Sequence, residues 1–255
     1  MMRPGTRLAL ALFVAGLPVA VHAQARAGGA PAPPPPRASA PIDLTGYWVA
    51  VVNEDWRFRM VTPAKGDYGG VPITKEALQI VNNWDPVADE KAGQQCKSYG
   101  AAAIMRLPAR LHITWQDDST LKVDVDAGTQ TRLFRFGPGG PGAGGREGER
   151  TWQGNSTAQW ERGGGRGGPP AGGSLTVVTK NMRAGYLRKN GVPYSENATV
   201  TEYFDLSPSP GGQILVVTTL VDDARYLTQP LIVSSHFKKE ADGSKWDPTP
   251  CSARW

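Results

Sequence analysis

Two histidines and one glutamate are the side chains with which this chain could carry out acid–base chemistry. His112 and His236 both lie in segments whose alternation of apolar and polar residues predicts β-strands. An imidazole titrates near neutral pH and can act as a general base. Glu202 shares a strand face with Val200 and Phe204, and such an apolar setting would raise the pKa of its carboxyl group toward the range of a useful acid or base. We therefore take His236, Glu202 and His112 as the candidate catalytic residues.

Each of the three also has a purely structural interpretation. A histidine on the polar face of a strand usually meets only water, and Glu202 is a surface charge if the alternate residues of its strand point inward. Alternation shows which residues share a face, but not which face is inside. The histidines and Glu202 lie on separate predicted strands without the spacing of metal ligands, so we expect no metal site and no bound cofactor.

Large aromatic side chains provide a second kind of candidate site. The chain contains eight tryptophans, several of them at strand positions. Rings of this size can bind an apolar, aromatic or sugar-like molecule by stacking. The candidate ligand-binding residues are Trp115, Tyr203, Trp152 and Trp160. The alternative, that such rings fill the core and its ends, applies above all to Trp48 and Trp115.

A mainly β fold must position these side chains. From residue 111 onward apolar residues recur with a period of two, and turns such as Asp117-Asp118-Ser119 separate the runs. About eight to ten antiparallel strands of this kind avoid open edges by closing into a barrel or by folding over as a sandwich. Of the two we expect a barrel, which can hold one small ligand. The expected strands cover residues 42–52, 56–61, 111–116, 121–125, 129–136, 151–161, 175–182, 198–206, 214–221 and 231–239.

One or two short helices are expected between the first strand and residue 110. Thr74 is a suitable N-cap for a helix whose apolar residues recur at helical spacing up to Trp84. Asp85 and Pro86 have the residue types of a second helix start, a capping carboxylate followed by proline at the first position.

Two glycine-rich stretches, residues 137–150 and 163–174, interrupt the predicted sheet. Glycine has a high conformational entropy, so we expect these stretches to be mobile hairpin loops. Neither lies between a strand and a helix, as a phosphate-binding loop would.

The first forty residues predict export. Arg3 and Arg7 precede an apolar run that ends in small residues around Ala23, which is the pattern of a signal peptide at residues 1–23. Residues 24–41 are rich in proline and alanine and predict a disordered tether, so residues 42–255 form the single folded domain. No transmembrane segment is expected after signal cleavage, and the mature protein is expected to be periplasmic or secreted. In such an oxidising compartment Cys96 and Cys251, the two cysteines, are expected to form a disulfide.

Charge argues against nucleic-acid binding. Four of the five net positive charges arise before Ile42, because the chain from that residue onward has 24 basic and 23 acidic residues. Nucleic-acid binding requires clustered cations that displace counterions from phosphates. The arginines of the glycine-rich stretches are interspersed with glutamates.

The start of the domain, Thr45-Gly46-Tyr47-Trp48, resembles the Gly-x-Trp signature that opens the first strand of lipocalin-like, calycin-type barrels. The resemblance implies that Trp48 closes one barrel end beneath a basic residue of the last strand, a place that Lys238 or Lys239 could take instead of the usual arginine. Longer segments, among them residues 126–132 and 246–251, resemble exported bacterial proteins whose function is not established.

Three functions are compatible with these observations. The first is binding of a small, largely apolar or aromatic ligand in the lumen of the barrel. The second is an enzyme, an isomerase, lyase or hydrolase of such a ligand, that uses His236 or His112 with Glu202. The third is a cell-envelope interaction module, which a filled lumen would favour. The oligomeric state is open.

Overall fold

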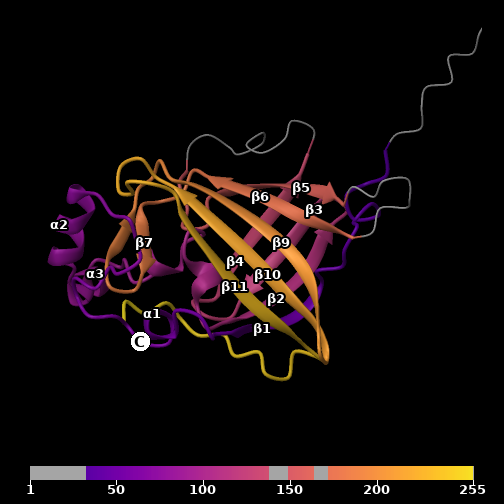
Figure 1. Cartoon of the computed structure of the whole chain (residues 1–255), viewed down its shortest axis with the longest axis horizontal. Coiled ribbons are helices and arrows are strands. Elements are labelled where there is room, and N and C mark those ends of the chain that lie inside the picture. The colour runs from indigo at the N-terminus through magenta and orange to yellow at the C-terminus, as the bar shows by residue number, and fades with distance from the viewer. Residues whose placement is uncertain (1–32, 138–148, 164–171, 255) are drawn as a thin grey trace, which may run out of the picture. The chain divides into compact units, whose positions relative to one another are not determined.

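Nine strands form a closed barrel in the computed structural model, which describes residues 33–137, 149–163 and 172–254 (Figure 1). Around the barrel the strands follow the order β1-β11-β10-β9-β6-β5-β4-β3-β2, which confirms a mainly β, closed architecture. The strands are β1 Gly46–Val51, β2 Arg110–Asp117, β3 Thr120–Val125, β4 Gln130–Phe136, β5 Asn155–Arg162, β6 Gly173–Lys180, β9 Thr199–Ser209, β10 Gly212–Asp222 and β11 Leu231–Glu240.

One pair of neighbours, β4 and β5, is parallel, whereas the other pairs in the barrel are antiparallel. A parallel pair requires the chain to return along the length of the barrel before the second strand begins. The connection that includes residues 137–150 is therefore not the hairpin loop that its glycine content predicts. Residues 163–172 do join antiparallel strands. The expected signal peptide, the first half of the tether (residues 24–32), and residues 138–148 and 164–171 lie outside the described residues.

Short helices and a small ribbon gather at one end of the barrel, on the left in Figure 1. The two expected helix starts are confirmed, because Thr74 Oγ1 accepts from Ala77 N at 3.3 Å and Asp85 Oδ1 accepts from Val87 N at 2.9 Å. None of the helices in the described residues is both long and apolar enough to span a membrane. The elements at this end are α1 Trp56–Arg59, α2 Lys75–Asn83, α3 Pro86–Lys91, the 3₁₀ turns η1 Lys97–Tyr99 and η2 Ile104–Arg106, and the ribbon β7 Gly185–Arg188 with β8 Val192–Tyr194.

The expectation of a strand at residues 56–61 is wrong, because this segment starts with helix α1. Asp55 has φ of 52°, in the left-handed region, and turns the chain out of the sheet just after β1. The alternating Trp56, Phe58 and Met60 do not mark a buried face, since Trp56 is 60% and Met60 is 50% exposed. The buried residue of this helix is Arg59, which is 3% exposed.

Side chains fill the interior of the barrel. Inward-facing residues of β1, β4, β9 and β11, such as Trp48, Phe134, Phe204 and Phe237, have an exposed fraction of 0%. A value of zero means that no water-sized space adjoins these side chains. The ammonium group of Lys239 lies 5.1 Å from the centre of the Trp48 ring, so a lysine of the last strand takes the place that the Gly-x-Trp resemblance implies.

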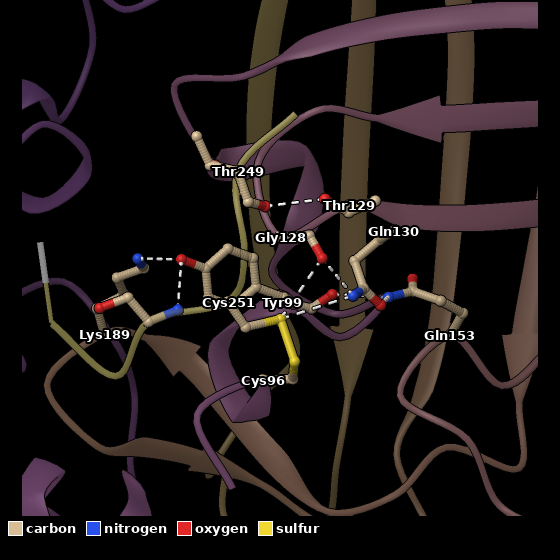
Figure 2. Close-up of a disulfide and its surroundings, with 10 residues drawn as sticks. Cys96, Tyr99, Gly128, Thr129, Gln130, Gln153, Lys189, Thr249 and Cys251 are labelled. Carbon is tan, nitrogen blue, oxygen red and sulfur yellow. Dashed lines mark hydrogen bonds between the residues drawn. A yellow bond between two sulfur atoms is a disulfide. The ribbon is translucent and has the colours of Figure 1, made fainter. Parts of the chain in front are cut away.

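The expected disulfide between Cys96 and Cys251 is present, with the two Cα atoms 5.1 Å apart (Figure 2). It joins the segment before η1 to the end of the chain across 155 residues of sequence. Thr249 adds to this attachment, because its carbonyl accepts from Thr129 Oγ1 at 3.0 Å. The C-terminal segment is thereby held against the β3–β4 turn.

Candidate functional site

The three candidate catalytic residues do not come together. Glu202 points into the barrel, whereas His112 and His236 point away from it on either side of β1. His112 is paired with Tyr47 and His236 with Val51. These partners are four residues apart on one strand, which corresponds to about 13 Å. No single site can therefore use the two histidines.

Glu202 forms a buried ion pair with Arg132 of β4. Arg132 donates from Nη1 to Oε1 at 2.9 Å and from Nη2 to Oε2 at 2.6 Å, and both side chains are 0% exposed. Thr179 Oγ1 accepts a further bond from Arg132 Nη2 at 3.2 Å. Both carboxylate oxygens of Glu202 are thus engaged by the guanidinium, and they lie in the filled interior.

His112 belongs to an aromatic stack on the outside of the barrel. Its ring lies 4.0 Å from that of Tyr47 with an angle of 2° between the planes, and the Trp246 ring meets both edge-on. This arrangement places His112 in a structural contact between β1, β2 and the C-terminal segment.

His236 lies beside a carboxylate, but the carboxylate is Glu54 rather than Glu202. The distance from His236 Nδ1 to Glu54 Oε2 is 3.5 Å. The other carboxylate oxygen, Glu54 Oε1, accepts from Arg59 Nη1 at 2.6 Å. His236 is therefore linked through Glu54 to the buried guanidinium of α1.

The four candidate ligand-binding aromatics do not form one site, although two of them, Trp115 and Trp160, are neighbours. Trp115 and Trp160 lie 6.4 Å apart, centre to centre, at the barrel end opposite the helices, and Trp160 Nε1 donates to the carbonyl of Pro36 at 2.9 Å. The chain just before the domain thus lies on this aromatic end. Trp152 stacks under Arg183 at 4.3 Å, and Tyr203 is 40% exposed on the outside of β9.

A pocket lies at the helical end of the barrel, and we call it the end pocket. It is more enclosed than two other hollows of the described structure. Its volume is about 200 Å³. The other two hollows, of about 430 and 470 Å³, are more open to solvent. The end pocket is lined by residues of α1, the loop after α1, η2, β7 and β11. Its apolar wall includes Phe58, Val71, Leu107, Leu187, Leu231 and Ile232.

The charged residues of the wall are mostly cationic, because Arg59, Arg106, Arg188 and Lys189 are basic and Asp55 is acidic. Hydrogen bonds hold the arginines in place. Arg59 Nε donates to the carbonyl of Arg106 at 2.8 Å, and Arg106 Nη2 donates to Asp55 Oδ2 at 2.7 Å. Arg188 donates to the carbonyl of Gly69 at 2.9 Å, and its guanidinium lies 4.0 Å from the centre of the Phe58 ring.

Burial and mutual repulsion both act on this cationic wall. Burial lowers the pKa of Arg59, and the positive charge of Arg106 lowers it further, while Glu54 opposes the shift. Burial also lowers the pKa of Arg188, against the effect of Asp55 and together with that of Arg106. The protein thus keeps several like charges together in a partly desolvated space, which is a frequent property of functional sites.

Lys189 connects the end pocket to the disulfide region. Its Nζ donates to Tyr99 Oη at 2.6 Å, and the same oxygen accepts from Ser252 N at 3.2 Å (Figure 2). Gln153 Nε2 donates to the Tyr99 carbonyl at 2.7 Å. Tyr99 therefore joins the pocket wall, the C-terminal segment and the connection before β5.

Sequence reasoning missed the residues of the cationic wall. Arg188 and Lys189 lie on and beside ribbon β7–β8, whose strands are too short to show alternation, but Asn190-Gly191 is a recognised signal for a tight turn. Gly191 has φ of +84°, and a Cβ there would come within 2.5 Å of Trp84. Asn190 donates to the carbonyls of Ala64 and Asp67, so this turn also holds the loop that contributes Gly69 to the pocket.

The lowered pKa of Lys189, about 8 because of burial, gives a prediction. Between pH 8 and 10 the unfolded chain binds more protons at this lysine than the folded chain. The free energy of unfolding therefore rises with pH from this source, by at most ~1.4 kcal/mol per pH unit. Lys189→Met lacks this titrating group. We therefore expect the free energy of unfolding of the wild type to increase relative to that of Lys189→Met as the pH rises, with at most the slope given above. Urea unfolding at pH 7.5, 8.5 and 9.5 measures both free energies.

Lys238→Met, at an exposed position of β11, is the control for a simple loss of charge. Stability curves of the wild type and Lys189→Met that run parallel across this pH range would contradict the prediction.

The described residues contain no group of three or more histidine, cysteine, aspartate or glutamate side chains that could hold a metal ion. Comparisons of the chain with protein-family models, with curated proteins and with solved structures find no match.

Proposed function

We propose that this chain is an exported, lipocalin-like barrel protein that binds a small ligand with a largely apolar or aromatic body, and that the end pocket is its binding site. The observation that carries the proposal is one enclosed pocket whose wall joins an apolar half to a set of fixed polar groups. Ligand sites in proteins commonly combine these two features. Binding in the lumen, as expected from the sequence, is not supported, because side chains fill the interior. The barrel therefore serves as the rigid support of the end pocket. A filled interior also favours the interaction module, and the end pocket is the observation that favours small-ligand binding over it.

The size of the end pocket fits this proposal. A cavity of roughly 150 Å³ holds a benzene molecule, and the end pocket measures about 200 Å³. Export is supported by the disulfide, because such bonds persist in oxidising compartments. The contact of Lys239 with Trp48 supports the lipocalin-like assignment.

The experiment that tests the proposal begins with identification of the ligand. Native mass spectrometry of the protein purified from the periplasm or the culture medium should show a bound small molecule. Its dissociation constant can then be measured by calorimetry for the variants below. A protein free of small molecules, and unaffected in thermal stability by a library of aromatic compounds, would contradict small-ligand binding.

Filling the pocket from Gly69 should abolish binding. Gly69 lines the end pocket, and a Cβ built there meets only Asp67 at 3.6 Å and Phe58 at 3.9 Å, which are ordinary contacts. Gly69→Leu therefore places a side chain in the pocket without straining the backbone. We expect at least about tenfold weaker binding, equivalent to ~1.4 kcal/mol. Gly137→Leu, where a Cβ meets nothing within 4 Å, is the matched control and should bind as the wild type does.

A second candidate function, an enzyme acting on the same ligand, is favoured by the 3.5 Å approach of His236 Nδ1 to Glu54 Oε2. Glu54 also contacts Arg59 of the pocket wall, so an acid–base pair lies next to the proposed ligand. Removal of a general base lowers turnover by roughly 10²–10⁴-fold. If the identified compound is converted, His236→Ala should cause such a loss with little change in binding, whereas His112→Ala should not. Equal activity of His236→Ala and the wild type would exclude this mechanism.

A further inference from the structure

The end pocket contains more positive charge than its surroundings neutralise. Arg59, Arg106 and Arg188 reach it from three elements that are far apart in sequence, α1, η2 and β7. Glu54 and Asp55 each accept from one of these guanidiniums. Arg188 has no carboxylate within ion-pair distance in the described structure, and its hydrogen bond there is to a backbone carbonyl.

A buried donor of Arg59 is left without an acceptor. The Arg59 side chain is 2% exposed, and its Nη2 atom has no hydrogen-bond partner among the described residues, although Nε and Nη1 are both bonded. An unsatisfied buried charged donor is costly, and native proteins usually supply it with a partner such as water or a ligand. Because Arg59 also lines the end pocket, an acceptor-bearing ligand there can partner this donor once the side chain turns and brings Nη2 from its buried position to the pocket surface.

We propose that the end pocket binds the anionic group of its ligand, a carboxylate or a phosphate, between the Arg188 and Arg59 guanidiniums, with the organic body of the ligand on the apolar wall. This inference rests on the proposed function, because it assigns the ligand class of the same site. A guanidinium presents paired N–H donors that match both oxyanions, and such charge-assisted bonds are stronger in a partly desolvated site. An anion also relieves the repulsion among the arginines, which a neutral ligand cannot do.

A matched pair of probes tests the inference. Phenylacetate and phenylacetamide have the same apolar body and nearly the same shape, and they differ in charge. Calorimetry with the disulfide-intact protein should show phenylacetate binding at least about tenfold more tightly than the amide. Arg188→Gln should remove most of this preference. Arg225→Gln is the matched control, because Arg225 also lies over an aromatic ring, at 5.0 Å from the centre of Tyr226, but outside the pocket.

If Arg188→Gln fails to fold, the salt dependence of probe affinity in the wild-type protein tests the same inference. Binding of phenylacetate should weaken between 50 and 500 mM NaCl, whereas binding of phenylacetamide should not, because salt screens the interaction between charges. Phenyl phosphate and inorganic phosphate form two further arms. Tighter binding of phenyl phosphate than of phenylacetate would assign a phosphate ester, and the reverse a carboxylate.

The outcomes separate the two proposals. Equal binding of phenylacetate and phenylacetamide, lost for both in Gly69→Leu, would overturn the anion inference and leave the small-ligand site in place. Inorganic phosphate that binds as tightly as phenyl phosphate would overturn the role of the apolar wall. No binding of any of the four probes, or binding unaffected by Gly69→Leu, would overturn the anion inference together with its site.

Discussion

Replacement of Glu202 by glutamine is expected to lower the free energy of unfolding by about 3–5 kcal/mol, because it leaves the Arg132 guanidinium buried without its counter-charge. Both side chains are 0% exposed, and the pair is joined by two hydrogen bonds of 2.9 and 2.6 Å. Glutamine has nearly the same shape as glutamate, so the change removes charge rather than volume. Urea unfolding monitored by tryptophan fluorescence measures the effect.

The double variant Arg132→Met/Glu202→Leu distinguishes charge from packing. Apolar residues of similar volume often replace a buried ion pair at little cost or with a gain in stability. We therefore expect the double variant to recover most of the stability that Glu202→Gln loses. Glu76→Gln, in the exposed ion pair with Arg225, is the matched control and should change stability far less. A loss of less than about 1 kcal/mol for Glu202→Gln would show that the buried charge is compensated otherwise.

The same variants separate the interior of the barrel from the end pocket. Neither Arg132 nor Glu202 lines that pocket. Glu202→Gln should therefore change stability while the folded protein keeps its affinity for the ligand. The role of Glu202 is thus expected to be structural, although its position on an apolar strand face is also what a catalytic carboxylate would have.

Local patterns predicted the parts of the fold that depend on local interactions. The alternation in residues 111–125 corresponds to strands β2 and β3, and the residues proposed as caps at Thr74 and Asp85 do accept backbone hydrogen bonds. The disulfide was predictable from two cysteines in a chain with a signal peptide pattern. In each case the interaction either lies within a few residues or has one possible partner.

Partner choice between distant strands was not predictable in the same way. The glycine content of residues 137–150 is typical of a turn. The parallel pairing of β5 with β4, however, depends on contacts between strands and not on the residues that connect them. The inward position of Glu202 depends on Arg132, 70 residues away in sequence. The end pocket is the extreme case, because its arginines come from three separate segments, and the one sequence signal near them is the Asn190-Gly191 turn beside Arg188.

The second large effect is expected from the disulfide. The Cys96→Ser/Cys251→Ser double variant should be less stable by about 2–5 kcal/mol, since the bond closes a long loop in the unfolded chain and thereby reduces its entropy. The loop spans 155 residues. Chemical unfolding of the wild type with and without a reductant, beside the double variant, measures the effect. The reductant should destabilise the wild type and leave the double variant unchanged.

Loss of the disulfide should also weaken ligand binding at the end pocket, because Tyr99 connects the two regions. Cys96 precedes η1, which contains Tyr99, and the Tyr99 hydroxyl accepts both from Ser252 of the C-terminal segment and from Lys189 of the pocket wall (Figure 2). When the C-terminal segment is released, Tyr99 loses one of these donors and Lys189 gains access to water. We therefore expect a weaker affinity for the ligand in the double variant and a larger increase in amide hydrogen exchange at residues 249–252 than in the barrel strands, whose protection falls only by the loss of global stability. Exchange that accelerates equally in β9 and β10 would instead mean that the disulfide stabilises the whole barrel and has no particular connection to the pocket.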